Sequence, residues 1–191
     1  MKPYKNILVR LDRIHRKCKL GETEIFIDTT YESQDWISTT GTVEGSGEEG
    51  VEAGDRIWVE YREILLSLGR IANPAQEHST LKYYKEGEDY LIFVRKSACY
   101  MIERDGEKIM LNGNLLVQPI YEKANMFSID EDLTPWAVVV VGEYEGEDLA
   151  GKTIIQGMRG ANQSALLPLD RGAKKGDPMI VYSKYVHAVI G

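Results

Sequence analysis

The chain has 191 residues, of which 43% are hydrophobic and 28% charged, a balance typical of a folded globular protein and not of a disordered tail. Its net charge of -7, from 23 basic and 30 acidic residues, disfavours binding to phosphate backbones and anionic lipid headgroups. Two cysteines are too few for a disulfide framework, and the first apolar run, Ile7–Val9, is too short for a signal peptide or a membrane span. We therefore expect a cytoplasmic protein that binds neither nucleic acid nor membranes.

Short β-branched runs closed by Gly, Asp or Pro recur along the chain, and each predicts a β-strand. Helical periodicity is weak, and it predicts one short helix, Arg62–Ala72, which Asn73-Pro74 would end. The pattern therefore predicts an all-β protein with a short helix inserted in its first half. The predicted strands are Ile7–Leu11, Ile25–Ile27, Arg56–Tyr61, Tyr90–Val94, Tyr100–Ile102, Leu115–Ile120, Ala137–Val141, Lys152–Ile155, Met179–Tyr182 and Val186–Ile190.

An internal repeat organises these strands. Three anchors recur in the same order, at offsets that fall from 108 (115 minus 7) to 97 (154 minus 57) and 88 (179 minus 91). The falling offset means that the second copy has shorter loops in two places. We predict two tandem domains, residues 1–106 and 107–191, joined by a tight Asp-Gly turn at Arg104–Glu107. The matched segments are Asn6–Val9 with Asn114–Val117, Val51–Ile57 with Asp148–Ile154, and Leu91–Glu103 with Met179–Gly191.

The order of motifs in the first copy resembles one known family. The motifs are an opening strand Tyr4–Arg10, a Gly-x-Val strand in Thr40–Val43 with Gly45 and Gly47 after it, a Val51–Val59 turn and strand around Gly54-Asp55, and a closing pair Leu91–Ile102. Together they resemble the co-chaperonins, the GroES-type lids of large chaperonin rings. The second copy is similar but has Gly151-Lys152 in place of Gly-Asp. The resemblance implies two tandem GroES-like β-barrel domains, with the stretch Gly45–Gly54 too short for the family's roof hairpin.

The resemblance also implies how the protein acts. Such lids dock on the chaperonin through an apolar triplet in a long mobile loop after the first strand. The matching stretch, His15–Thr40, contains Ile25-Phe26-Ile27, and the second copy offers Met126-Phe127. The resemblance thus implies partner-binding roles for these five residues, a mobile segment over Glu22–Thr39 and a GroEL-type chaperonin ring as the partner. Strand propensity alone favours Ile25–Ile27 as an ordinary barrel strand, so this alternative stays open beside docking, as does a plain core role for Met126-Phe127.

Two apolar terminal strands favour self-association. Ile7–Arg10 and Val186–Ile190 lack a gatekeeping proline, so we expect them to be sheet edges that pair between neighbours in a closed homo-oligomeric ring. This leaves a second hypothesis of a different class. In it the protein is a structural or adaptor component, for example of a virion or another ring assembly, that uses the barrel pair only for oligomerisation.

No motif in the sequence supports catalysis. Gly45–Gly50 spells G-x-G-x-x-G, but it holds two glutamates and no helix is predicted after it, so a phosphate cradle is not expected. His15, His78 and His187 are scattered, as are Cys18 and Cys99, and this spacing does not fit a zinc site. No nucleophile motif such as G-x-S-x-G is present. We therefore expect a protein that is not an enzyme and has no catalytic residue, metal or cofactor.

Overall fold

Antiparallel β-strands make up most of the described chain. The computed structural model describes residues 5–12, 17–20, 23–26, 38–68, 83–86, 89–123, 131–157, 167–168 and 175–190. Within these residues α2 (Tyr61–Ser67) is the one α-helix, so the protein is all-β with a short helix in its first half, as predicted. The chain divides into two compact units, Met1–Cys99 and Tyr100–Gly191. The division into domains at residue 106 stays a prediction.

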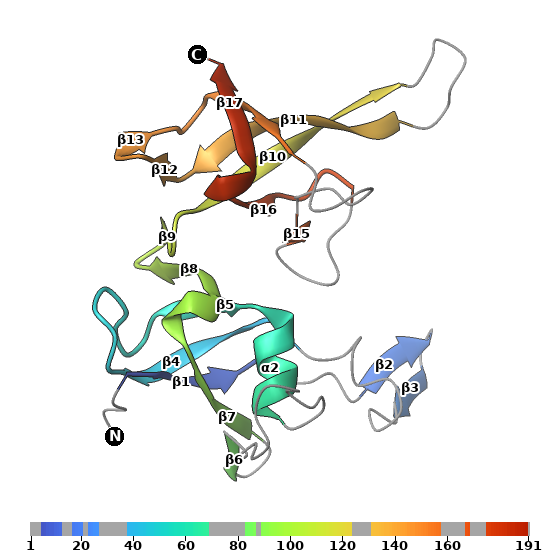
Figure 1. Ribbon diagram of the computed structural model, residues 1–191. Coiled ribbons are helices and arrows are strands. Elements are labelled where there is room, and N and C mark those ends of the chain that lie inside the picture. The colour runs from blue at the N-terminus through green and yellow to red at the C-terminus, as the bar shows by residue number, and fades with distance from the viewer. Residues whose placement is uncertain are drawn as a thin grey trace. The chain divides into compact units, whose positions relative to one another are not determined.

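The first unit is built on an antiparallel sheet with the strand order β6-β7-β1-β4-β5 (Figure 1). The helix α2 follows β5 and packs against β7, where the Ser67 hydroxyl donates a hydrogen bond of 3.1 Å to the carbonyl oxygen of Phe93. Ile64 and Leu65 of the helix are buried. The strands are β1 (Ile7–Leu11), β4 (Thr40–Ser46), β5 (Arg56–Val59), β6 (Tyr83–Glu86) and β7 (Asp89–Val94), and a separate pair consists of β2 (Lys17–Leu20) and β3 (Thr23–Phe26).

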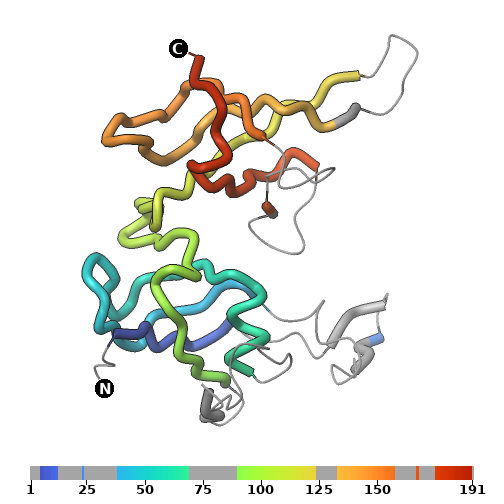
Figure 2. The backbone as a smooth tube through the Cα atoms, in the orientation of Figure 1, coloured from blue at the N-terminus to red at the C-terminus, as the bar shows by residue number. Residues whose placement is uncertain are grey.

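The second unit contains a sheet with the order β15-β16-β10-β11-β14-β17. A short 3-10 turn, Ser183–Tyr185, links β16 to β17, just as Lys96–Ala98 links β7 to β8. Figure 2 shows β10 and β11 running together as one long ribbon. The strands are β8 (Cys99–Arg104), β9 (Glu107–Met110), β10 (Asn114–Lys123), β11 (Glu131–Val141), β12 (Glu143–Tyr144), β13 (Glu147–Asp148), β14 (Thr153–Gln156), β15 (Leu167–Pro168), β16 (Met179–Tyr182) and β17 (Val186–Ile190).

The two sheets share strand order and register. Val9 pairs with Val43, and Val117 pairs with Val139, so β1 corresponds to β10 at the offset of 108 predicted from sequence (117 minus 9). Each pairing contains a β-bulge at the same place, between Leu8 and Val9 and between Leu116 and Val117. The buried core residues also correspond. They are Ile7 and Leu115, Val9 and Val117, Val43 and Val139, Ile57 and Ile154, and Val94 and Val181.

The turn that precedes β5 in the first unit is repeated before β14 in the second. Gly54 and Gly151 both have a positive φ, 97° and 81°, a conformation that glycine adopts without the steric cost of a Cβ. The amide of Gly54 donates to the carbonyl of Val43, and the amide of Gly151 donates to that of Val139, each over 2.8 Å. The turn is therefore equivalent in both copies although Asp55 is replaced by Lys152.

Of the two terminal strands expected at sheet edges, only the last one lies at an edge among the described residues. The expectation that Ile7–Arg10 forms a free edge is wrong, because β1 pairs with β4 on one side and β7 on the other, with Ile7 and Val9 fully buried. Among the described residues, β17 does lie at an edge, and its Val189 and Ile190 are 38% and 45% exposed.

No sheet closes into a barrel within the described ranges. In the same ranges no helix is long and apolar enough to cross a membrane.

Candidate partner-docking site

The predicted docking triplet begins in a hairpin that is separate from the first-unit sheet. The strand β3 pairs with β2, placing Ile25 opposite Cys18 and Phe26 opposite Lys17. Among the described residues, these two strands pair only with each other. The alternative in which Ile25 and Phe26 form a strand of the main sheet is therefore not what the backbone adopts.

The other residues predicted to bind the partner lie outside the described residues. These are Ile27, Met126 and Phe127. The predicted mobility of Glu22–Thr39 stays a prediction, although Thr23–Phe26 within it forms β3.

Polar side chains tie together the two ends of the segment that carries this hairpin. The backbone amide of Asp12, just after β1, donates to the carbonyl of Thr40, the first residue of β4, over 3.0 Å. The Thr40 hydroxyl donates to the Asp12 carboxylate, and Arg56 donates to the same carboxylate oxygen at 3.0 Å. The guanidinium of Arg56 also lies 5.4 Å from the ring centre of Trp58. We call Asp12, Ser38, Thr40 and Arg56 the loop-base cluster.

Burial suggests that the loop-base cluster fixes the loop ends. Thr40 is only 6% exposed, and a buried hydroxyl without a partner destabilises the fold by about 1 to 3 kcal/mol. Its hydroxyl has that partner in Asp12, and its amide donates to the Ser38 hydroxyl over 3.1 Å. The cluster therefore holds Asp12 and Thr40 together at the base of the segment.

The second copy treats the corresponding connection differently. Thr134, which corresponds to Ser38 at an offset of 96 (134 minus 38), also accepts the amide of the residue two positions on, Trp136, over 3.2 Å. There, however, β10 and β11 continue to pair as far as Lys123 and Glu131. The first copy leaves the ladder at Asp12, whereas the second extends it into a longer ribbon. Among the described residues, this particular connection thus carries a separate hairpin only in the first copy.

The structure describes the surroundings of two side chains that could in principle take part in catalysis, Cys99 and His187. Cys99 is a buried thiol that donates a hydrogen bond to the carbonyl oxygen of Arg95, and burial together with the carboxylate of Glu63 raises its pKa to about 12, which disfavours the reactive thiolate. His187 is exposed, and its imidazole lies so close over Gly157 that any side chain at that glycine would collide with it. The environment of Cys99 is therefore not that of an activated nucleophile.

Sequence reasoning missed the loop-base cluster. Its members come from the end of β1, the start of β4 and the start of β5, and no local motif joins them. The one available signal was the pair of small hydroxyl residues, Ser38 and Thr40, just before a strand. Such residues commonly bond to nearby backbone amides.

No protein-family model matches the chain, and no curated protein or solved structure is significantly similar to it.

Proposed function

We propose that the protein is a co-chaperonin-like ring subunit, made of two tandem GroES-like domains, that caps a large GroEL-type chaperonin in a cytoplasm and assists protein folding. It would dock through the segment that contains Ile25-Phe26-Ile27. The duplicated sheet, with equal strand order, register and bulge in the two units, supports the tandem-domain part of the proposal. The motif order of the first copy supports the choice of family.

One observation carries the docking part of the proposal. The hairpin β2–β3 is a sheet of its own, and the connection that carries it is held at its base by the loop-base cluster. An element arranged in this way can change its contacts without unfolding the sheet behind it. A loop whose ends are already fixed also loses less conformational entropy when it binds than one with free ends.

The size of the triplet suits weak docking that is repeated around a ring. Three apolar side chains contribute about 4 to 8 kcal/mol of burial before ordering costs, and those costs leave little net affinity for one loop. Linked loops on one ring bind together, so their affinities combine. A monomeric protein with a single such loop would bind poorly.

The test is the substitution Phe26→Ala, with Thr23→Ala on the same strand as the matched control. Phe26→Ala removes the largest anchor, about 1 to 2 kcal/mol per loop, and the loss multiplies across the ring. We expect Phe26→Ala to abolish co-sedimentation with a GroEL-type chaperonin while leaving the melting temperature within about 2 °C of the wild type. Thr23→Ala should bind normally.

The opposite outcome favours the structural or adaptor protein. A large loss of stability in Phe26→Ala, about 3 to 5 kcal/mol, would mean that Phe26 belongs to a core and would contradict docking. The observation that favours this second function is the exposed apolar edge β17, with Val189 and Ile190 open to solvent. An unprotected edge of this kind is suited to strand pairing between copies.

A further inference from the structure

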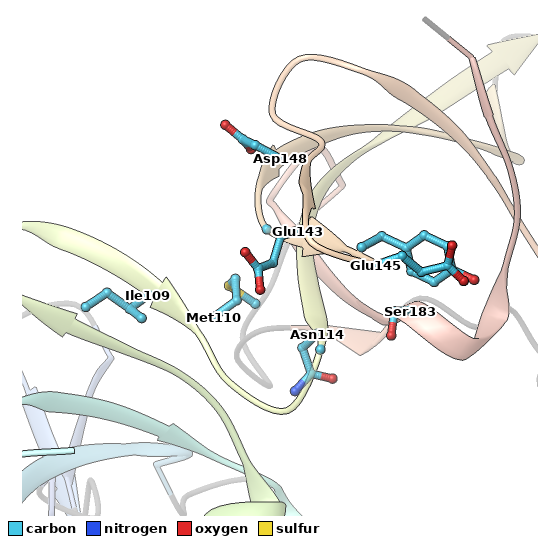
Figure 3. Close-up of a pocket in the computed structure, with 10 residues that line it drawn as sticks. Ile109, Met110, Asn114, Glu143, Glu145, Asp148 and Ser183 are labelled. Atoms are coloured by element: carbon cyan, nitrogen blue, oxygen red, sulfur yellow. The ribbon is translucent and has the colours of Figure 1, made fainter. Parts of the chain in front are cut away.

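An acidic pocket in the second unit lies beside the β12–β13 hairpin (Figure 3). Its volume is about 610 Å³, and the residues that line it include three carboxylates, Glu143, Glu145 and Asp148. All three side chains are exposed, and no lysine or arginine is among the described residues that line the pocket. The pocket therefore has a negative potential that its own lining does not neutralise.

A buried acceptor among the residues that line this pocket has no hydrogen-bond partner among the described residues. Asn114 is 2% exposed and lines the pocket. Its amide nitrogen donates to the carbonyl oxygen of Leu111 over 2.7 Å, which fixes the orientation of the side chain. Among the described residues, no donor reaches its Oδ1, and Figure 3 shows this oxygen on the side of Ser183. Buried polar atoms without partners are uncommon, so the site calls for a ligand that donates a hydrogen bond.

In the first unit a side chain of the chain itself reaches the corresponding loop. Its equivalent loop, residues 44–53, is also acidic and hollowed. In that unit the ammonium of Lys96 donates a hydrogen bond of 2.6 Å to the carbonyl oxygen of Glu49. An ammonium group of the chain itself thus reaches the acidic loop of copy one.

The pairing register identifies the residue that replaces Lys96 in the second unit. Ile7 pairs with Val94, and its counterpart Leu115 pairs with Val181, so the offset here is 87 (181 minus 94). Two equivalent backbone hydrogen bonds give the same offset. The amide of Glu60 donates to the carbonyl of Ala98, and the amide of Gly157 donates to the carbonyl of Tyr185 (185 minus 98 is 87). Lys96 therefore corresponds to Ser183, a residue that lines the acidic pocket. The side chain that brings an ammonium to copy one is reduced to a short hydroxyl in copy two.

We infer that the acidic pocket, defined by Asn114, Glu143, Glu145, Asp148 and Ser183, binds an alkylammonium group supplied from outside the chain. An ammonium donates three hydrogen bonds and carries one positive charge, which matches a pocket whose lining holds both an orphan carbonyl oxygen and carboxylates. A metal ion fits less well, because the described residues contain no cluster of three ligating side chains with suitable geometry. The group belongs to a lysine of a partner polypeptide or to a free alkylamine, and the two share this chemistry. The inference does not depend on the proposed chaperonin docking.

Amide chemical shifts of the ¹⁵N-labelled full-length protein test the site. The probes are n-butylamine, the blocked peptide acetyl-Gly-Lys-Gly-amide and the same peptide acetylated on the lysine. Because the carboxylates are exposed, we expect a dissociation constant of about 1 to 10 mM for butylammonium that weakens in 0.5 M salt. The amides of Asn114, Tyr144 and Ser183 should shift, and the acetylated peptide should produce no shift.

Variants make the test specific. The double variant Glu143→Gln/Glu145→Gln should weaken butylammonium binding at least tenfold, whereas Glu122→Gln, an exposed glutamate on β10 away from the pocket, should not change it. Ser183→Lys restores the ammonium of the first copy and should abolish binding of the added amine while the melting temperature stays the same or rises.

The outcomes separate the sources of the cation. Tighter binding of the lysine peptide than of butylamine identifies a polypeptide lysine, and binding of butylamine alone identifies a free amine. The inference is overturned if the wild type shows no saturable shifts with either probe up to 50 mM. Equal binding by the wild type, the Glu143→Gln/Glu145→Gln variant and a folded Ser183→Lys protein also overturns it.

Discussion

The buried carboxylate of Glu63 makes the first unit sensitive to the loss of one exposed arginine. Glu63 lies in α2 with its side chain 5% exposed, and Arg95 binds it through two hydrogen bonds of 2.7 and 3.1 Å. The hydrogen bond and the charge of Glu63 raise the pKa of Arg95, so the arginine is charged at all relevant pH values. The substitution Arg95→Met keeps most of the aliphatic stem but leaves the carboxylate buried without a partner.

The size of the loss follows from this geometry. Removing one partner of a fully buried ion pair destabilises a protein by about 3 to 5 kcal/mol. Here the arginine side chain is 59% exposed, so water reaches the vacated side of the carboxylate. We therefore expect about 2 to 3 kcal/mol. The matched control is Arg10→Met, whose partner Glu44 is 36% exposed, and which should lose less than about 1 kcal/mol.

Native-state hydrogen exchange measures this loss in the first unit alone. The amides of Ile92 and Val94 in β7 report the free energy of opening of the sheet against which α2 packs. Replacing both members of the pair, Arg95→Met with Glu63→Leu, should recover most of the loss, because no buried charge remains. Equal losses in Arg95→Met and Arg10→Met would refute the reasoning, since the burial of the carboxylate would then make no difference.

Three further outcomes follow from the structure. Gly41→Ala should lower the free energy of unfolding by about 1 to 3 kcal/mol, because a Cβ there would overlap the carbonyl oxygen of Arg10 and lie 2.6 Å from Cγ1 of Val9; an unchanged melting temperature would contradict this close approach. Burial raises the pKa of Cys99 from 9.0 to about 12, so the folded state keeps its proton longer than the unfolded state. Wild-type stability should therefore fall between pH 9 and 12, by up to about 1.4 kcal/mol per pH unit, relative to Cys99→Val, and parallel pH profiles of unfolding free energy in denaturant would exclude this effect. Val189→Lys should reduce the sedimenting mass if β17 is the pairing edge of a ring, and an assembly that resists this change would place the contact elsewhere.

The local sequence pattern predicted most of the strands, but not the features that depend on pairing with neighbouring strands of the sheet. Runs such as Met179–Tyr182 and Val186–Ile190 become β16 and β17 with unchanged bounds, because their alternation and β-branching are enough. The strand β4 begins with three small or hydroxyl residues, Thr40, Gly41 and Thr42, so the family resemblance and not local propensity predicted it, and β1 and β5 pair with it on both sides. The predicted strand Arg56–Tyr61 is two residues too long at its end, since the helix begins at Tyr61.

The repeat was visible in the sequence to within one residue. Similar letters suggested the offset of 88 for the last anchor, which aligns Lys96 with Lys184. Strand pairing gives 87 and aligns Lys96 with Ser183. The sequence comparison matched segments of equal length and polarity pattern, whereas in the fold the hydrogen-bond ladder decides the register. That shift of one position conceals the acidic pocket from sequence analysis.

The candidate docking site was predictable only in part. The triplet Ile25-Phe26-Ile27 could be located from its resemblance and its apolar character, and its role stays a prediction. The loop-base cluster could not be found, because Asp12, Thr40 and Arg56 are brought together by the pairing of three strands. Contacts of this kind depend on the tertiary fold and leave no spacing rule in the sequence.

The shared bulge and register of the two units raise a problem of self-recognition during folding. A chain with two sheets of the same pattern can pair β1 with β11 as well as with β4, and swapping between repeats is a characteristic misfolding route of tandem proteins. Side-chain volume discriminates between these pairings. Gly41 of β4 leaves room for the close approach of Val9 and the backbone of Arg10, whereas the corresponding residue of β11, Ala137 (137 minus 41 gives 96), carries the Cβ that this approach forbids. The absence of a Cβ at Gly41 thus favours the pairing of β1 with β4 of its own unit over a pairing with β11.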